Sequence, residues 1–501
     1  MSDAWAGVEA VETRPLAALF EAEPDRLARL VVDEAGICFD FSKTHLSAPL
    51  VAAFETLAEA QHFDRARTAL FSGEIVNHSE GRAAEHTAER GQGAPESVAR
   101  ARQLHARMRA LVDAIEAEAL GPIRSILHIG IGGSALGPAF LIDALGRDSG
   151  RYETAVVSNV DGAALEEALR RFDPATTLVV IASKSFTTAE TLLNAQSALA
   201  WLEEGGVVDP YGRAIAVTAV PERAIEFGID ETRVLPISET VGGRYSLWSA
   251  VGLPAALALG WGGFEELLEG AAAMDRHFLY QPHGRNAPVL AAFADLYYGS
   301  VRGAESRAVF AYDERLRLLP PYLQQLEMES NGKSATQEGK PVGRATAPIT
   351  WGGVGTDAQH ALFQLLHQGS HMVPVEFVAA IEPEHGLEFD HHRHLLANCF
   401  AQGAALMAGK ASDDPVRTLP GDRPSTTLLL DRVDPFTLGA LIAFYEHRTF
   451  VNATLLGINP FDQFGVELGK EIARTIGRGG NGTIDPSTRA LITRAFGDSP
   501  E

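Results

Sequence analysis

The sequence is poor in cysteine, and this scarcity excludes two kinds of protein. Its 501 residues contain only Cys38 and Cys399, which lie far apart and form no CxxC pair. A disulfide framework needs several cysteines, and a cysteine-rich zinc site needs them at close spacing. The sequence therefore excludes both a disulfide-stabilised scaffold and a zinc site of this type.

Long hydrophobic runs are lacking as well. No uninterrupted apolar stretch approaches the roughly 20 residues that a membrane-spanning helix needs. The N-terminal segment MSDAWAGVEAVETRPLAALF has no basic stretch followed by an apolar one, so it does not have the pattern of a signal peptide. We therefore expect a soluble protein of the cytoplasm.

Positive charge is in short supply. The chain has 42 Lys and Arg residues against 65 Asp and Glu residues, for a formal net charge of -23. This balance disfavours nucleic acid and anionic membranes as partners. A small anionic ligand is still compatible with it, provided that basic side chains or backbone amides gather at one place.

What remains is the composition of an ordinary globular protein, with 46% hydrophobic and 21% charged residues. The length predicts roughly two to four domains. Residues 1–100 show mostly helical periodicity, as in LSAPLVAAFETLAEAQ. The polar, glycine-bearing segment at 77–93 interrupts this pattern, and we expect it to be an exposed loop.

From about residue 124, short β-rich runs alternate with helical stretches, which is typical of βαβ units with parallel sheets. The runs fall into two series, at 125–133, 154–160, 176–183, 214–220 and 233–238, and then at 307–313, 347–353, 374–381 and 426–433. We therefore expect an α/β fold with two α/β domains. The predicted parts are a helical N-terminal region at 1–100, α/β domains at 101–275 and 276–450, and a helical C-terminal segment at 451–501.

The motif HIGIGGSALGPAF at 128–140 stands where a strand should end and a helix begin. Its glycines permit a tight turn and a close approach of backbone to a ligand. Their spacing does not give GxGxxG, which disfavours an NAD-binding enzyme of the Rossmann type. By itself the motif is as compatible with a packing turn as with a binding loop.

A second motif, TLVVIASKSFTTAETLLNA at 177–195, combines a predicted buried strand with four hydroxyl side chains and one lysine at 183–188. Hydroxyls, an ammonium group and the first amides of a helix suit a phosphate group. A plain Ser/Thr helix cap with a solvated Lys184 is the alternative. The density of hydroxyl groups around one lysine favours the phosphate site.

Two charged residues stand beside glycines or at a helix end. Arg244 follows two glycines in VGGRYSLWSAVGLP, where a guanidinium could hold developing negative charge. Glu329 ends the helical pattern PYLQQLEMESNGK, where a carboxylate could act as a general base. Local spacing alone favours a surface arginine and a solvated glutamate.

Histidines do not indicate a metal site. His360 and His367 lie seven residues apart and therefore on one helix face, but the i, i+4 spacing of HExxH is absent. A buried, hydrogen-bonded histidine is the default interpretation of each. Gln463 and Lys470 flank a glycine in NPFDQFGVELGKEIA, a pattern that is also compatible with an ordinary surface helix.

Taken together, these segments closely resemble the phosphoglucose isomerase family. The resemblance rests on GIGGSALGP, SKSFTTAET, GGRYSLWSAVGLP, QQLEMESNGK, GTDAQHALFQLLHQG and DQFGVELGK, in the family's order and spacing across residues 130–475. It implies two sugar-isomerase (SIS) domains, each an α/β/α sandwich around a mainly parallel sheet. It also implies a helical C-terminal arm that embraces the second subunit of a homodimer.

The resemblance also implies roles for individual residues. Glu329 would move a proton between C2 and C1, Arg244 would stabilise a cis-enediolate, and His360, donated by the neighbouring subunit, would open the sugar ring. Lys470 would lie near the ring oxygen. The residues implied in substrate binding are Gly133, Ser134, Ser183, Lys184, Ser185, Thr188, Gly243, Gln325 and Gln463.

The implied reaction is the reversible conversion of glucose 6-phosphate to fructose 6-phosphate, without a metal or another cofactor. One base that reaches both carbons and one cation for the oxyanion are sufficient for such a shift. Two alternatives remain open. They are a bifunctional glucose/mannose-phosphate isomerase and a non-catalytic SIS protein that senses sugar phosphates.

Overall fold

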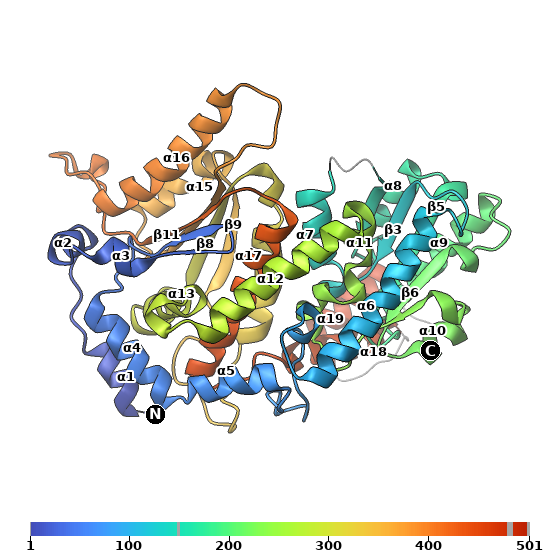
Figure 1. Cartoon of the computed structure of the whole chain (residues 1–501), viewed down its shortest axis with the longest axis horizontal. Coiled ribbons are helices and arrows are strands. Elements are labelled where there is room, and N and C mark those ends of the chain that lie inside the picture. The colour runs from blue at the N-terminus through green and yellow to red at the C-terminus, as the bar shows by residue number, and fades with distance from the viewer. Residues whose placement is uncertain (1, 148–150, 478–483, 498–501) are drawn as a thin grey trace. The chain divides into compact units, whose positions relative to one another are not determined.

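The computed structural model of the chain describes residues 2–147, 151–477 and 484–497. The chain divides into two compact units, Met1–Pro460 and Phe461–Glu501. The larger unit contains two sheets with helices packed on them (Figure 1). This arrangement confirms the predicted α/β fold with two mainly parallel sheets.

The first sheet is entirely parallel, in the order β4-β3-β5-β6-β7. Its strands are β3 (Ser125–Ile129), β4 (Glu153–Val157), β5 (Thr177–Ala182), β6 (Ala214–Thr218) and β7 (Val234–Pro236). Every residue of β3, β5 and β6 is buried, because helices cover both faces of a parallel sheet. These helices are α6 (Pro95–Glu116), α7 (Leu136–Leu145), α8 (Gly162–Arg171), α9 (Ala189–Glu204) and α10 (Pro221–Phe227).

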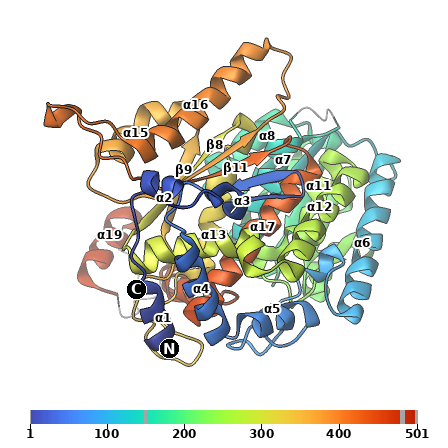
Figure 2. The same ribbon diagram turned by 60° about the vertical axis from the view of Figure 1, so that its left-hand side comes forward.

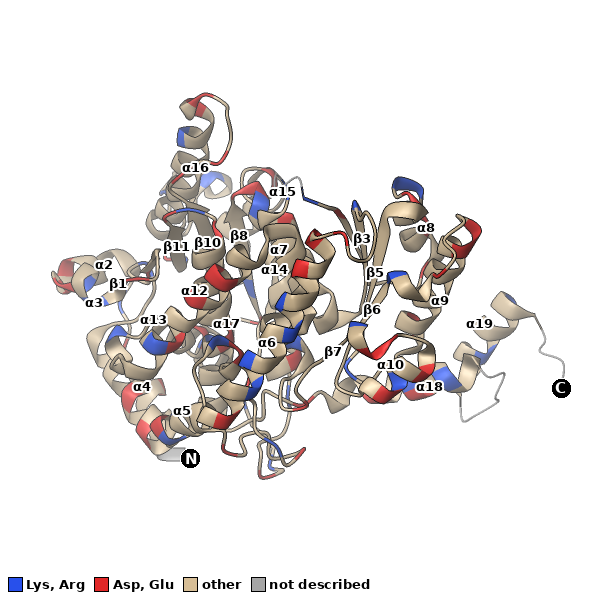
Figure 3. Ribbon diagram, turned by 45° about the vertical axis from the view of Figure 1, so that its right-hand side comes forward, with Lys and Arg blue, Asp and Glu red and all other residues tan. Residues whose placement is uncertain are grey.

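One face of this sheet packs on α8, α9 and α10 in a single apolar cluster, while α6 and α7 contact the outer strands β7 and β4. Figure 3 shows blue bands along α6, which carries Arg100, Arg102, Arg107 and Arg109. Positive charge is therefore gathered locally in a chain whose net charge is -23.

The second sheet has the order β1-β2-β11-β10-β8-β9. Its parallel part consists of β8 (Ser306–Tyr312), β9 (Ile349–Val354), β10 (Val375–Ala380) and β11 (Ser425–Leu430). One of its faces is covered by α15 (Asp357–Gln368) and α16 (Phe389–Ala408), which lie next to each other in Figure 2. The short helix α14 (Leu319–Leu323) contacts β8 and β9.

The N-terminal region is not purely helical. It contains a hairpin of β1 (Val31–Glu34) and β2 (Ile37–Asp40), and β2 pairs antiparallel with β11 of the second sheet. Ala35 and Gly36 form the turn with φ of 49° and 75°, which matches the two left-handed residues of a tight hairpin. The helices of this region are α1 (Ser2–Glu9), α2 (Leu16–Ala22), α3 (Arg26–Leu30), α4 (Ala48–Ala60) and α5 (Phe63–Ser72).

The prediction of an exposed loop at 77–93 is wrong for its second half. Residues 86–90 are buried, and the Arg90 guanidinium donates hydrogen bonds to the carboxylates of Asp275 and Glu446 while it lies over the Trp248 ring. A polar segment can be buried where each charge meets an opposite charge and a hydrogen-bond partner. The sequence offers no local sign of such distant partners.

Helices α12 (Trp261–Tyr280) and α17 (Pro435–Leu456) pack against each other at very short range, and both are visible beside α13 (Ala287–Leu296) in Figure 1. A Cβ on Gly270 would lie 1.8 Å from the Phe436 carbonyl oxygen, and one on Gly439 would lie 2.0 Å from that of Leu267. Glycine is therefore required at both crossing points. The helix α11 (Leu253–Leu259) contacts α12.

The C-terminal unit, taken by itself, contains α18 (Glu467–Gly477) and α19 (Pro486–Phe496). Leu468 and Ile472 on α18 are 66% and 43% exposed, so apolar side chains face outward from this helix. Among the described residues, the structure contains no helix with the length and apolarity needed to cross a membrane.

Candidate active site

The first glycine motif forms a tight turn between β3 and α7. Residues Gly132–Ser134 make a single 3₁₀ turn, and a Cβ on Gly133 would lie 2.2 Å from the carbonyl carbon and oxygen of Gly243. The His128 ring donates from Nε2 to the Ser134 carbonyl oxygen at 2.6 Å. Complete burial lowers the pKa of His128 to about 4, so this ring is neutral and fixes the turn as a donor.

The second motif forms a loop of hydroxyl side chains between β5 and α9, which we call the hydroxyl loop (residues 183–188). Ser183 Oγ lies 3.0 Å from Thr188 Oγ1, and Ser185 Oγ lies 2.7 Å from Thr187 Oγ1. Phe186 has φ of 50° and its ring is buried in the first apolar cluster. A left-handed conformation is strained for a bulky residue, so burial of this ring holds the loop in its shape.

Lys184 is engaged with backbone rather than with the hydroxyl groups. Its ammonium donates to the carbonyl oxygens of Glu239 at 2.7 Å and Val241 at 2.8 Å. Burial lowers the pKa of Lys184 to about 8, and the nearby Arg82 guanidinium acts in the same direction. Two of the three ammonium donors are thus occupied.

Arg244 lies in the 3₁₀ segment Gly243–Trp248, and its side chain is 3% exposed. Its Nε donates to Ser330 Oγ at 2.6 Å and its Nη2 to the Pro460 carbonyl oxygen. The Tyr245 hydroxyl also contacts Ser330 Oγ, at 2.9 Å. Arg244 is therefore a fixed, buried cation and not the surface arginine that local spacing favours.

Glu329 ends a π-helical turn at Gln324–Glu329, a local widening of the helix that is frequent at functional sites. Its Oε1 lies 3.5 Å from Arg244 Nη1, and its Oε2 accepts a hydrogen bond from Gln325 Nε2 at 2.8 Å. A Cβ on Gly132 would lie 2.9 Å from that same Gln325 nitrogen. The Glu329 side chain is 22% exposed, so a buried cation orients a carboxylate that a ligand can still reach.

The opposite face of this π-helical turn is fixed to the protein by Glu327. Its carboxylate accepts from Thr350 Oγ1 at 2.8 Å and is paired with the buried guanidinium groups of Arg307 and Arg448. The turn is thus attached to β8, β9 and α17, and Gln325 and Glu329 project from its other side.

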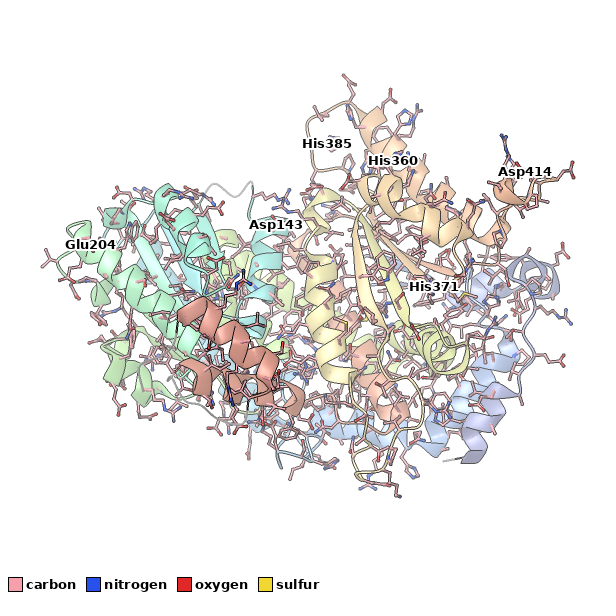
Figure 4. All side chains as sticks on the ribbon, turned by 180° about the vertical axis from the view of Figure 1, so that it is seen from behind. Asp143, Glu204, His360, His371, His385 and Asp414 are labelled. Carbon is pink, nitrogen blue, oxygen red and sulfur yellow. The ribbon has the colours of Figure 1, made fainter. Side chains whose placement is uncertain are left out.

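His360 lies in the first turn of α15, after Thr356 with φ of 58°. Its side chain is exposed, and Figure 4 shows it at the outer end of α15. No hydrogen bond within the described residues connects it to Glu329 or Arg244.

Gln463 and Lys470 belong to the C-terminal unit. Lys470 lies on α18 and is exposed, and Gln463 immediately precedes a short 3₁₀ turn at Phe464–Val466. In residues 2–147, 151–477 and 484–497, no group of three or more His, Cys, Asp or Glu side chains is arranged to hold a metal ion.

The structure thus brings together residues from three distant parts of the sequence. The first glycine turn touches Gly243 and Gln325, and Arg244 lies beside Glu329. Sequence reasoning missed Ser330, which accepts from Arg244, and His128, which holds the glycine turn. Both lie within the quoted motifs, but a serine or histidine there gives no sign of which backbone or side chain it meets.

The sequence model described as phosphoglucose isomerase matches residues 40–492. A protein named glucose-6-phosphate isomerase from Rhizorhabdus wittichii is 71% identical over 494 residues, covering 99% of each chain. The chain belongs to the phosphoglucose isomerase family. Another member with the same printed name, from Zymomonas mobilis, is 62% identical and covers 98% of this chain and 97% of its own.

A solved structure of a phosphoglucose isomerase family member agrees in fold. The crystal structure of a glucose-6-phosphate isomerase from Chlamydia trachomatis superposes with a TM-score of 0.90 at 31% identity, covering 98% of each chain. The match to the phosphoglucose isomerase family extends over every predicted site residue, from Gly133 to Lys470.

Proposed function

We propose that this chain interconverts glucose 6-phosphate and fructose 6-phosphate by moving a proton between C2 and C1 through a cis-enediolate. Membership of the phosphoglucose isomerase family and the names of its relatives support this reaction. The observation that carries the mechanism is the pairing of Glu329 Oε1 with Arg244 Nη1 at 3.5 Å. A base and a cation side by side are what an enediolate needs.

In this proposal Glu329 is the base that takes the proton from one carbon and returns it to the other. One carboxylate can do both because the two carbons of a planar enediolate present the same face. Arg244 stabilises the oxyanion, and its fixed position means that little reorganisation is needed as charge develops. Gln325 holds the second carboxylate oxygen and so aims the first.

We assign the phosphate group to the hydroxyl loop. Ser183, Ser185 and Thr188 supply hydroxyl donors, and α9 offers backbone amides at its N-terminal end. Ser134 would donate from the glycine turn, with Gly133 and Gly243 allowing close approach of the backbone. Anchoring the phosphate away from the reacting carbons converts binding energy into orientation of those carbons.

We further propose a homodimer in which His360 of one subunit opens the sugar ring in the site of the other. The exposed position of His360 and the absence of a contact with Glu329 within the described residues support a role across an interface. Lys470 and Gln463 would line the same site. Light scattering should give about twice the chain mass of 53.6 kDa, and a fully active species at 53.6 kDa would contradict this proposal.

The remaining predictions also stand as proposals. The two SIS domains would cover 101–275 and 276–450, between the N-terminal region at 1–100 and the C-terminal segment at 451–501. The reaction would need no cofactor, because Glu329 and Arg244 supply the base and the cation. The protein would work in the cytoplasm, on a free sugar phosphate rather than at a membrane or on nucleic acid.

The decisive measurement is turnover of fructose 6-phosphate to glucose 6-phosphate by purified protein, with and without EDTA. We expect Glu329→Gln to lower kcat by about 10²–10⁴-fold, the usual contribution of a general base. Binding of the sugar phosphate should persist, because the hydroxyl loop is unchanged. Glu338→Gln, at an exposed residue paired with Lys340, is the matched control and should keep full activity.

The same assay separates the alternatives. Turnover of mannose 6-phosphate at a comparable rate would indicate the bifunctional enzyme. Binding without any turnover by the unaltered protein would indicate a sensing protein. Loss of activity in EDTA would replace the proposed mechanism with a metal-dependent one, and full activity of E329Q would remove Glu329 from its role.

A further inference from the structure

The side chain of Lys184 connects two loops that the candidate site uses separately. Lys184 belongs to the hydroxyl loop, yet its ammonium donates to carbonyl oxygens of a different segment, at Glu239 and Val241. That segment follows β7 and leads directly into Gly242, Gly243 and Arg244. Through its bond to the Val241 carbonyl oxygen, Lys184 therefore holds the backbone three residues before Arg244, the cation of the site.

The segment it holds is also the one that meets the glycine turn. Gly243 lies so close to Gly133 that a Cβ on Gly133 would come within 2.6 Å of the Arg244 amide nitrogen. Three peptide bonds join Val241 to Arg244, and the two glycines between them are held in place: the Tyr245 amide donates to the Gly242 carbonyl oxygen at 3.0 Å, and Gly243 packs on Gly133. A shift at Val241 would therefore be passed to Gly243 and Arg244. The position of the Arg244 guanidinium thus depends on where Val241 is held.

Residues of the N-terminal region also hold this segment. Arg82 Nη1 donates to the Glu239 carbonyl oxygen at 3.1 Å, and Thr240 Oγ1 donates to Glu85 Oε2 at 2.8 Å. These partners come from the N-terminal region. Within the described part of the chain, the Val241 carbonyl oxygen accepts from Lys184 only, so this bond is the direct link to the hydroxyl loop.

The two hydrogen bonds of Lys184 come from a charged donor that is costly to bury. Lys184 is partly buried, and burial together with Arg82 lowers its pKa to about 8, while Glu80 and Glu239 oppose this shift. Hydrogen bonds from a charged donor are roughly twice as strong as neutral ones, so the two carbonyl groups offset part of this cost. An ammonium that held phosphate alone would not need to be tied to two carbonyl groups.

We propose that Lys184 is a positioning residue, whose ammonium couples the hydroxyl loop to the backbone segment that presents Arg244. The proposal rests on the proposed function, because it assigns phosphate to one loop and the enediolate to the other. Binding of phosphate would then stiffen the loop that carries Lys184, and through Lys184 the segment before Arg244. A displacement near 1 Å at a reacting centre can cost about 10²-fold in rate, which sets the scale of the expected effect.

The test compares Lys184→Met with Lys184→Arg, which can still donate to two carbonyl groups. Lys340→Met, at an exposed lysine paired with Glu338, is the control and should behave as the unaltered protein. We expect K184M to lower kcat by about 10-fold or more, and K184R to recover most of this loss. The inhibition constant of inorganic phosphate should change by less than about 3-fold, because the hydroxyl donors remain.

Hydrogen exchange without ligand provides a measurement that phosphate binding does not affect. Amides of residues 239–245 should exchange faster in K184M than in the unaltered protein or K340M. An unchanged exchange rate with a weakened inhibition by phosphate would overturn the proposal and make Lys184 a direct phosphate ligand. An unchanged kcat would also overturn it. If K184M does not fold, Lys184→Gln is measured against the same thresholds.

Failure of the proposed function gives a different result. In that case the unaltered protein converts no sugar phosphate, although exchange at 239–245 still responds to K184M. Turnover by the unaltered protein together with unaltered exchange in K184M would leave the isomerase intact and remove only the positioning role.

Discussion

The side chain of Arg244 shows how much a single residue depends on its neighbours. It uses separate nitrogens for Ser330, for the Pro460 carbonyl and for Glu329. A guanidinium donates from three nitrogens set apart in a rigid plane, whereas an ammonium donates from a single nitrogen. The geometry of the carboxylate base is therefore linked to the identity of the cation as well as to its charge.

We predict that Arg244→Lys, which keeps the charge, lowers kcat by about 10²–10³-fold with a much smaller change in KM. A single ammonium cannot replace three guanidinium contacts, so the charge no longer sits where the oxyanion forms. Steady-state kinetics measures both constants. Arg170→Lys on the exposed face of α8, where Arg170 pairs with Glu166 at 3.8 Å, should have no effect. A rate for R244K within 3-fold of the unaltered enzyme would contradict this role.

At the scale of elements, the contact between α12 and α17 determines where the buried charges of α17 lie. This helix carries Glu446 and Arg448, which pair with Arg90 and Glu327. Glu327 lies in the π-helical turn that ends at Glu329. The glycine contact between the two helices thus supports the base through a chain of buried ion pairs.

We predict that Gly439→Ala destabilises the fold by about 1–3 kcal/mol, because its Cβ would lie 2.0 Å from the Leu267 carbonyl oxygen and force the helices apart. Chemical denaturation measures the free energy of unfolding. Gly262→Ala on α12 is the matched control, since its Cβ would meet nothing within 4 Å and alanine favours a helix. Equal stability of the two variants would show that the helices can separate without cost.

At the scale of the whole molecule, several histidines are buried in neutral form. Burial lowers the pKa of His128 to about 4 and holds that of His86 well below its ordinary value. Such groups bind protons more readily in the unfolded chain, so acid favours unfolding. The carboxyl of Glu446 acts in the opposite sense, since burial raises its pKa to about 7.

We predict that His128 contributes stability that is fully present above its unfolded pKa near 6.5 and is lost as the pH falls towards 4. The contribution over this window is about 3 kcal/mol, from a pKa difference of roughly 2.5 units. The unaltered protein should therefore lose more of its free energy of unfolding than His128→Gln when the pH is lowered from 7 to 4.5. Their difference cancels the opposing effect of Glu446, and a difference that is independent of pH would contradict the prediction.

Much of the fold is predictable because its signals are local. The nine β-rich runs between residues 125 and 433 each form a strand, since buried parallel strands need continuous apolar sequence. The hairpin at residues 31–40 is missed because its strands are short and its partner, β11, lies almost 400 residues away. Burial of Arg90 is missed for the same reason, as its partners are Asp275 and Glu446.

By itself the sequence determined the family, because each motif can be recognised from the residue types of one short segment. It also predicted a phosphate-binding loop after β5, because four hydroxyl groups and one lysine are gathered at residues 183–188. Tertiary structure alone decided that Glu329 is a half-buried carboxylate beside a buried Arg244 rather than a solvated helix end. It also decided that Lys184 donates to backbone carbonyl groups, those of Glu239 and Val241, just before Arg244. Both facts depend on contacts between segments about 55 to 85 residues apart, and such distances in sequence become short only when the sheets and helices pack.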